Sequence, residues 1–108
     1  MGTHDELLGR LELGLKRYKH GVRVDDDTRT WGTPKNSWIE MTKEELLDAI
    51  IYVIADYIRT QEERGENDDN ELIMKYAKDC KLIKSENHRL VLHNLNSLLT
   101  NDIFKGPY

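Results

Sequence analysis

The chain has 108 residues, of which 38% are hydrophobic and 33% charged, and its mean hydropathy is -0.71. This length suits a single domain, and no apolar run approaches the roughly 18–20 residues of a membrane-spanning helix, which excludes a membrane protein. The lone Cys80 excludes an intrachain disulfide, and without a secretory start we expect a cytoplasmic protein. Sixteen basic against 20 acidic residues argue against general nucleic-acid binding. A core this small favours self-association, and we expect a homodimer or tetramer.

The first expected helix covers about residues 4–19 and is amphipathic. A capping box formed by Thr3 and Glu6 opens it, and Gly21 ends it. Its apolar side chains are spaced to share one helix face: Leu7, Leu8, Leu11, Leu15 and Tyr18. Residues 21–36 follow without an apolar period, and a long stretch of this kind in a small domain is functional or disordered.

The second expected helix is largely apolar. Two capping boxes overlap at its start, Ser37 with Glu40 and Thr42 with Glu45, so the first turn stays open between them. Apolar residues then cover more than half of the helix circumference as far as about Arg59: Leu46, Leu47, Ile50, Ile51, Val53, Ile54, Tyr57 and Ile58. A helix with this pattern is expected to be central in the fold and packed on several sides.

The last third of the chain predicts one or two further helices. After a polar linker at residues 61–70, a third helix begins at Asp69 or Asn70 and continues to Ile83. A fourth begins at Ser85, although the two could form one helix with a polar break. Residues 101–108 are expected to be a flexible tail. The fold class is therefore all-α, a single domain (residues 1–108) built as a small bundle of three to four helices that dimerisation completes.

Three acids in the second helix have a spacing that suggests a metal site. Glu40, Glu44 and Asp48 are each four residues apart, so all three lie on one side of the helix. Like charges gathered beside a buried surface repel one another, and a divalent cation relieves that repulsion. Oxygen ligands suit Mg²⁺ or Mn²⁺. The alternative is that the acids only cap the helix and stabilise its positive end.

The loop at residues 21–36 supplies groups that could bind a nucleotide. Arg29 and Lys35 could pair with phosphate oxygens, and Trp31 could stack on a base. The alternative is structural. Arg29 would then pair with one of the neighbouring aspartates at positions 25–27, and Trp31 and Trp38 would fill gaps between helices.

The segment EELLDAIIYVIADYI, residues 44–58, resembles the acidic helix of the MazG-like all-α nucleoside triphosphate pyrophosphohydrolases. The longer stretch from 16 to 59 is similar to small phage-type members of that family. The family signature is EExxE, followed on the next helix by ExxD. Glu44, Glu45 and Asp48 match the first half as EExxD, whereas the second half is not present in its usual form. If the second and third helices are antiparallel about the linker, Asp79 comes nearest to Asp48, and Glu12 is another candidate ligand.

This resemblance implies Mg²⁺-dependent hydrolysis of an NTP or dNTP to a monophosphate and pyrophosphate. Glu40, Glu44, Asp48 and Asp79 would hold the metal, and Glu45, outside its ligand shell, would accept a proton from the attacking water. Two alternatives stay open. One is a non-catalytic helical dimer that binds a nucleotide or a protein and has an incomplete metal site. The other is a structural oligomer in which the acids only cap.

Overall fold

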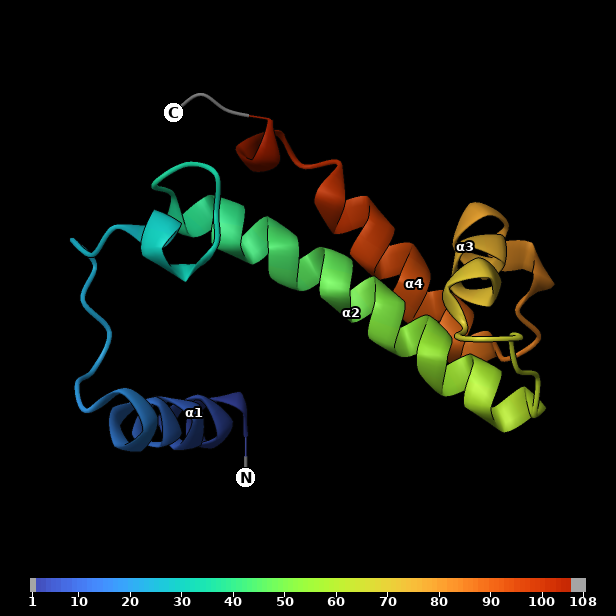
Figure 1. The fold of residues 1–108 in the computed structure, drawn as a ribbon, viewed down its shortest axis with the longest axis horizontal. Coiled ribbons are helices and arrows are strands. Elements are labelled where there is room, and N and C mark those ends of the chain that lie inside the picture. The colour runs from blue at the N-terminus through green and yellow to red at the C-terminus, as the bar shows by residue number, and fades with distance from the viewer. Residues whose placement is uncertain (1, 106–108) are drawn as a thin grey trace.

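The computed structural model describes residues 2–105, and this part of the chain is all-α, as the sequence predicts (Figure 1). It contains helices and turns but no strand. Within the same residues, no helix is both long and apolar enough to span a bilayer. The four α-helices are α1 (Thr3–Tyr18), α2 (Trp38–Gln61), α3 (Asn70–Lys78) and α4 (Glu86–Leu99). Three short 3-10 helices complete the structure: η1 (Thr28–Trp31), η2 (Cys80–Leu82) and η3 (Asp102–Phe104).

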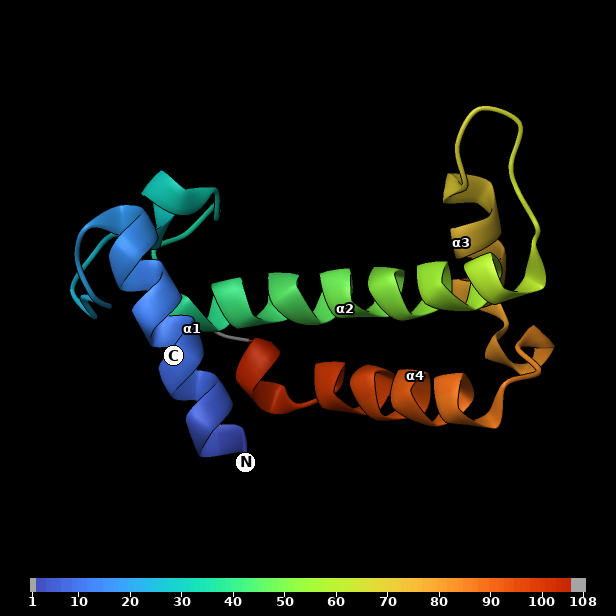
Figure 2. The same cartoon turned by 90° about the horizontal axis from the view of Figure 1, so that it is seen from below.

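The helices α2 and α4 run side by side in opposite directions, and α3 crosses α2 near its C-terminal end (Figure 2). The buried core lies where these three helices meet: Ile54, Tyr57, Ile58, Tyr76, Ile83 and Leu92. The prediction of a central α2 is therefore confirmed for the part of the helix from Ile54 onward. Before that residue, Leu47 and Ile51 are 45% and 43% exposed, because α3 does not extend over that part of the helix.

Two tyrosine hydroxyls fasten this core with hydrogen bonds. Tyr57 accepts the backbone N–H of Lys84 at 3.0 Å, which ties α2 to the segment before α4. Tyr76 donates to a carboxylate oxygen of Glu63 at 2.5 Å. The two rings meet edge to face with centroids 5.3 Å apart, a favoured aromatic geometry. The buried aromatic side chains therefore keep their polar atoms paired.

The ends of the first two helices differ in detail from the sequence expectation. The first helix begins at Thr3 itself, after Gly2, and no side chain caps it. It ends at Tyr18, and Lys19, which follows with a positive φ of 68°, takes the left-handed position that Gly21 was expected to occupy. At the start of α2 the Ser37 hydroxyl accepts the N–H of Glu40, so the first of the two candidate boxes sets the boundary. Thr42 instead donates to a carbonyl within the helix.

The third and fourth helices are separate, which settles the alternative left open by the sequence. The third helix ends at Lys78, because the backbone of Asp79 is not helical (φ -139°, ψ 85°) and its carboxylate accepts the N–H of Lys81 to start η2. The expected flexible tail is partly structured. Its Asn101 side chain caps η3, which packs against α2. The remainder of the expected tail, 106–108, lies outside the described residues.

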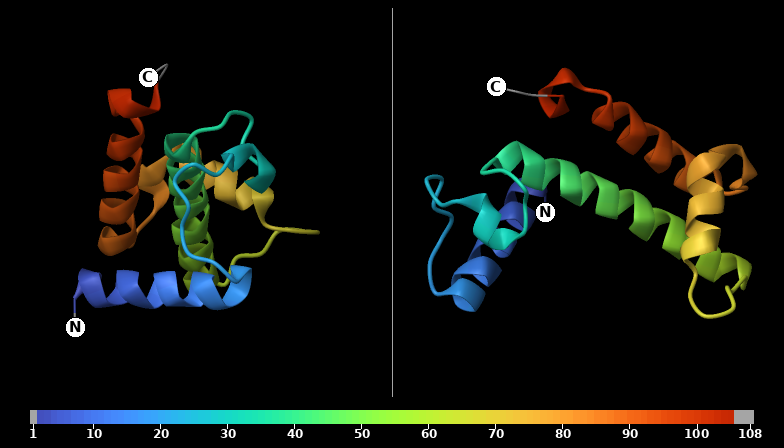
Figure 3. Two further views of the ribbon diagram at one scale, coloured as in Figure 1. Left: turned by 90° about the vertical axis from the view of Figure 1, so that its left-hand side faces the viewer. Right: turned by 45° about the horizontal axis from the view of Figure 1, so that its top comes forward.

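The first helix stands apart from the others (Figure 3). None of its residues is buried. Its C-terminal end meets the rest of the chain through the ring of Tyr18, which stacks on Trp31 with centroids 6.3 Å apart. The expected apolar face of this helix is present in the structure, but nothing in the described chain covers it.

Candidate metal and nucleotide site at the start of α2

The acid row of α2, Glu40, Glu44 and Asp48, follows one side of the helix, and all three side chains are half-buried. Glu40 is engaged, because its Oε2 accepts the backbone N–H of Lys35 at 3.0 Å. Within residues 2–105, the side chains of Glu44 and Asp48 take part in no hydrogen bond or ion pair. One helical turn separates them. The acid row therefore contains two neighbouring carboxylates, and in the described chain neither has a hydrogen-bond donor or a cation to offset its charge.

The remaining predicted acids lie elsewhere. Asp79 caps η2, in the segment that Lys84 fastens to Tyr57, and Tyr57 is about 13 Å further along α2 than Asp48 at 1.5 Å per residue. Since α3 crosses α2 instead of running antiparallel to it, this geometry does not bring Asp79 toward the acid row (Figure 2). Glu45 is exposed, on another side of α2.

The described part of the chain contains no group of three or more His, Cys, Asp or Glu side chains arranged to hold a metal ion. Glu12 is exposed on α1, the helix that stands apart. The row is accordingly an open pair of carboxylates, not a closed cage of protein ligands.

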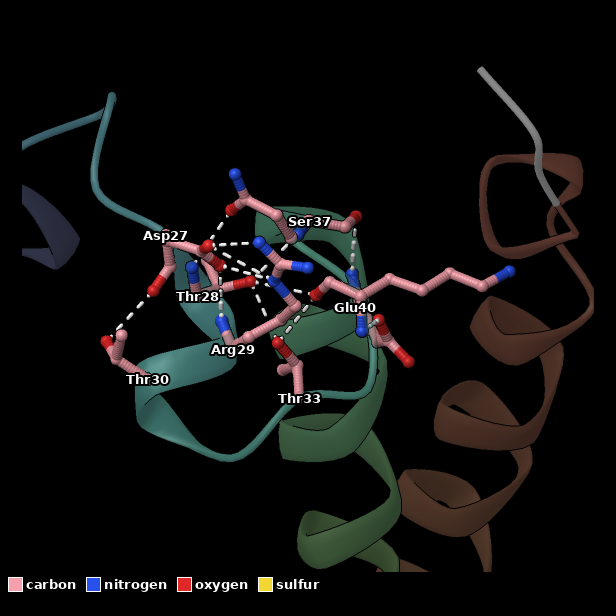
Figure 4. A network of polar contacts seen from close by, with 9 residues as sticks. Asp27, Thr28, Arg29, Thr30, Thr33, Ser37 and Glu40 are labelled. Atoms are coloured by element: carbon pink, nitrogen blue, oxygen red, sulfur yellow. Dashed lines mark hydrogen bonds and ion pairs between the residues drawn. The ribbon is translucent and has the colours of Figure 1, made fainter.

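The loop before α2 is held by a compact hydrogen-bond network around two buried threonines, Thr28 and Thr33 (Figure 4). Their hydroxyl oxygens lie 2.8 Å apart, and both contact the carbonyl oxygen of Lys35, at 3.0 and 2.7 Å. The Thr28 hydroxyl also accepts the N–H of Ser37 at 2.8 Å. The loop is therefore ordered and fixed to the first turn of α2. Sequence reasoning missed these threonines, because isolated threonines in a polar loop give no periodic signal.

Arg29 adopts the structural alternative considered for it. Its guanidinium forms a two-pronged pair with the carboxylate of Asp27, with Nε 3.0 and 3.1 Å from the two oxygens. The side-chain hydrogen bonds from Arg29, followed by its backbone N–H, lower the pKa of Asp27 to about 2, and the same pairing raises the pKa of Arg29. Lys35 differs, because its side chain is exposed and makes no ion pair in the described structure. Lys35 is therefore one of the cations near the acid row, with Lys43, that form no ion pair in the described chain.

The aromatic residues of this region form a short ladder. The ring of Trp31 stacks on Tyr18 and meets Trp38 edge to face, with centroids 5.4 Å apart. Trp38 also donates its indole N–H to the carbonyl of Val24 at 2.9 Å, so it holds the loop as the structural alternative expected. Trp31 keeps 46% of its surface exposed. An exposed part of its ring is therefore available for further stacking.

A hollow of about 350 Å³ lies between α2 and α4. Its lining is largely apolar in surface and includes three ionisable side chains, Tyr52, Asp56 and His88, beside Val53, Asn87 and Val91. His88 and Asp56, which are 32 residues apart in the chain, contact each other in this lining.

Comparisons of the chain with protein-family models, with curated proteins and with solved structures find no match. The fold and the arrangement of the side chains are therefore the basis for assigning a function. Of the predicted site residues, the structure brings Glu40 and Lys35 together through the backbone of Lys35, and it places Glu44 and Asp48 on the same side of α2.

Proposed function

We propose that the chain is a nucleoside triphosphate pyrophosphohydrolase, which uses Mg²⁺ or Mn²⁺ to split an NTP or dNTP into a monophosphate and pyrophosphate. The observation that carries the proposal is the pair formed by Glu44 and Asp48, which are half-buried and have no hydrogen-bond or ion-pair partner in the described chain. Two neighbouring carboxylates in partial shelter repel each other and are incompletely solvated. A bound divalent cation relieves both penalties. The resemblance of residues 44–58 to the MazG-like acidic helix supports the same assignment.

The open character of the pair fits the way in which Mg²⁺ binds to proteins. This ion keeps several waters and is commonly held by one or two carboxylates together with the phosphates of the substrate. Glu44 and Asp48 would be the ligands, and the second carboxylate oxygen of Glu40, which the Lys35 N–H does not engage, would be the next nearest donor. When bound, the ion would supply charge neutralisation at the phosphates and would orient or acidify an attacking water.

The other groups have roles that follow from their surroundings. The exposed ammonium of Lys35 would bind a phosphate, and the open part of the Trp31 ring would stack on the base. Glu45 would accept the proton of the attacking water. Arg29 could join the phosphates only by leaving Asp27, so its contribution would require a rearrangement of the loop.

The proposal is tested by a pyrophosphate-release screen over the common NTPs and dNTPs with Mg²⁺, with Mn²⁺ and with EDTA. We expect release that requires the metal, and a loss of about 100-fold or more for Asp48→Asn and Glu44→Gln, because catalytic groups of this kind contribute about 100-fold or more to the rate. Glu71→Gln removes an exposed acid from the first turn of α3 and is the matched control. Absence of release from every nucleotide, or full activity in Asp48→Asn, would contradict the proposal.

A second candidate is a helical dimer that binds a nucleotide or a protein without catalysis. The placement of Asp79 favours it, because the acid row then lacks the ligand that the family pattern takes from the next helix. Such a module would be stabilised thermally by a nucleotide and Mg²⁺ without release of pyrophosphate. A purely structural oligomer would show neither effect, and Asp48→Asn would raise its melting temperature by relieving repulsion.

A further inference from the structure

Three side chains at the start of α4 form a continuous hydrogen-bonded chain from a hydroxyl to a carboxylate. The hydroxyl oxygen of Ser85 lies 2.5 Å from Nδ1 of His88, and Nε2 of the same ring lies 2.7 Å from Oδ2 of Asp56 on α2. A neutral ring with its proton on Nε2 satisfies both contacts, and Nδ1 then accepts the hydroxyl proton. This arrangement joins a nucleophile, its general base and the carboxylate that orients the base.

The two ring nitrogens are exchanged relative to the usual serine triad, in which Nε2 faces the serine. Either nitrogen is an acceptor when the other carries the proton, so the exchange leaves the roles of the three groups intact. The ring of His88 also packs against Tyr57, which helps to fix its orientation. Ser85 and His88 are half-buried and Asp56 is exposed, so a small molecule can reach the hydroxyl.

The first turn of α4 offers hydrogen-bond donors for the negative charge that an attack by Ser85 would create. The hydroxyl oxygen of Ser85 caps this helix and accepts the backbone N–H of His88 at 3.3 Å. The N–H groups of Glu86 and Asn87, between these two residues, donate to no acceptor within residues 2–105. In hydrolases whose nucleophilic serine precedes a helix, the N–H of the following residue belongs to the oxyanion hole. The positive end of the helix adds to this stabilisation.

An apolar space adjoins the same groups. Asp56 and His88 line the hollow of about 350 Å³ between α2 and α4, and so does Asn87, which supplies one of the two free N–H groups. The rest of its wall is apolar or aromatic: Tyr52, Val53 and Val91. Small-molecule sites are commonly of this size and are lined by apolar side chains with a few polar groups. The hollow therefore suits the apolar part of a molecule whose reacting group lies beside Ser85.

We infer that Ser85, His88 and Asp56 form a second site, which hydrolyses carboxylic esters with a small apolar acyl group. Ser85 and His88 are the catalytic residues, and Asp56 positions the ring. Oγ of Ser85 bonds to the carbonyl carbon as its proton passes to Nδ1 of His88. The electron pair of the C=O double bond moves onto its oxygen, beside the N–H groups of Glu86 and Asn87. When the double bond re-forms, the bond to the alcohol oxygen breaks, and that oxygen takes the proton from Nδ1.

A water molecule then releases the acyl group from Ser85. The water oxygen bonds to the acyl carbon and gives a proton to Nδ1, after which the bond to Oγ breaks and Oγ recovers this proton. The net reaction converts an ester and water into a carboxylic acid and an alcohol. No step uses a metal ion, so EDTA separates this activity from metal-dependent release of pyrophosphate.

The first test treats the full chain with an alkyl fluorophosphonate in the presence of EDTA and locates the adduct by peptide mass spectrometry. Ser37 is an internal control, because its hydroxyl caps α2 in the same way but contacts no histidine in the described structure. We expect Ser85 to react about 100-fold faster than Ser37 or more, since a general base assists it. Equal rates, or reaction at neither serine, would show that Ser85 only caps the helix and would overturn the inference.

The second test follows hydrolysis of p-nitrophenyl butyrate in EDTA. Ser85→Asn keeps a good helix cap but removes the nucleophile, and His88→Asn removes the base. We expect each to lower kcat/KM by about 100-fold or more, whereas His93→Asn, at an exposed position of the same helix, should leave it unchanged. Far-UV circular dichroism verifies that each variant is folded. No turnover by the unaltered chain, or turnover that persists in Ser85→Asn, would refute the site.

The positioning role of Asp56 has its own readout. Asp56→Asn should lower kcat by about 10-fold or more and leave KM for the ester unchanged, because the ring loses its orientation while the hollow remains. Asp56→Glu, which restores a carboxylate at this exposed position, should recover part of the loss. A change in KM alone would assign Asp56 to ester binding and would contradict the positioning role.

Discussion

Nε2 of His88 lies 2.7 Å from Oδ2 of Asp56, and this contact joins the first turn of α4 to α2. The other ring nitrogen, Nδ1, lies 2.5 Å from the hydroxyl oxygen of Ser85, the residue that caps α4. The ring also meets Tyr57 at an angle, with centroids 5.7 Å apart. In the neutral ring these contacts correspond to an Nε2–H that donates to the carboxylate and an Nδ1 that accepts from the hydroxyl. One side chain thereby connects a helix cap, a neighbouring helix and the aromatic core.

We expect His88→Ala to lower the free energy of unfolding by about 1–2 kcal/mol, because it removes these hydrogen bonds and a partly buried ring. The matched control is His93→Ala on the same helix, an exposed position that should change stability by less than about 0.5 kcal/mol. Urea unfolding followed by circular dichroism measures both. Equal effects at the two positions would show that the contacts of His88 with Asp56, Ser85 and Tyr57 do not stabilise the fold.

Tyr76→Phe should destabilise the protein at neutral pH by about 1–2 kcal/mol, since it removes the hydrogen bond to Glu63 from a residue that is only 5% exposed. The hydrogen bond, and then burial, raise the pKa of Tyr76 to about 12 from its ordinary 10. Ionisation of this hydroxyl therefore favours the unfolded chain, so its contribution is complete below pH 10 and is lost as the pH rises toward 12.

The difference in unfolding free energy between the unaltered chain and Tyr76→Phe should accordingly shrink between pH 10 and 12, as measured by urea unfolding at several pH values. Tyr52→Phe is the control, because Tyr52 is 67% exposed and its hydroxyl makes no hydrogen bond in the described structure. A difference that stays constant across this range would contradict the assignment of the raised pKa to the contact with Glu63.

Thr28→Val tests the hydrogen-bond network that holds the loop before α2. The substitution keeps the shape of the side chain but leaves the N–H of Ser37 without its acceptor and removes the contact with Thr33. Because Thr28 is fully buried, we expect a loss of about 2–3 kcal/mol in denaturant unfolding. Thr30→Val removes a hydroxyl of the same loop that is exposed and should cost much less. Equal losses would show that the buried hydroxyl does not organise the loop.

Lowering the pH should destabilise the loop at residues 21–36 by protonating Asp27. The side-chain hydrogen bonds from Arg29, and then its backbone N–H, lower the pKa of Asp27 from 3.8 to about 2, so the stabilisation is present above pH 4 and is lost as the pH falls through 2. Tryptophan emission recorded between pH 4 and 2 should follow this loss, since Trp31 ends the turn that Asp27 caps. Asp27→Asn should lack the transition, whereas Asp25→Asn, at an exposed position, should retain it. A transition that persists in Asp27→Asn would assign it to another group.

The helices could be predicted from the sequence because their signals are local. Ser37 caps α2 as expected, and the apolar pattern that follows lies within one long helix. The third helix was predicted to continue to Ile83, and that prediction was wrong beyond Lys78. Asp79 leaves the helix because its carboxylate binds a nearby backbone N–H instead. Ile83 is still fully buried, since the 3-10 turn keeps its side chain on the core side.

Only the part of the candidate site that lies on α2 could be predicted from the sequence. The common side of Glu44 and Asp48 follows from their spacing, and the structure has them both half-buried. The position of Asp79 depended instead on the angle between two helices, which neither sequence segment specifies. The buried pair formed by Thr28 and Thr33 likewise depends on how a loop without a period closes on itself.

The separation of α1 from the core divides the chain into two cooperative units. Because α1 buries none of its residues, the opening of its backbone does not require the packing around Ile54 and Leu92 to open. Amide protons of α1 should then exchange with solvent through local fraying, while those of α2 near the core exchange only in global unfolding. Substitutions among the exposed side chains of α1 before Tyr18 should therefore leave the folding of the three helices that form the core unchanged.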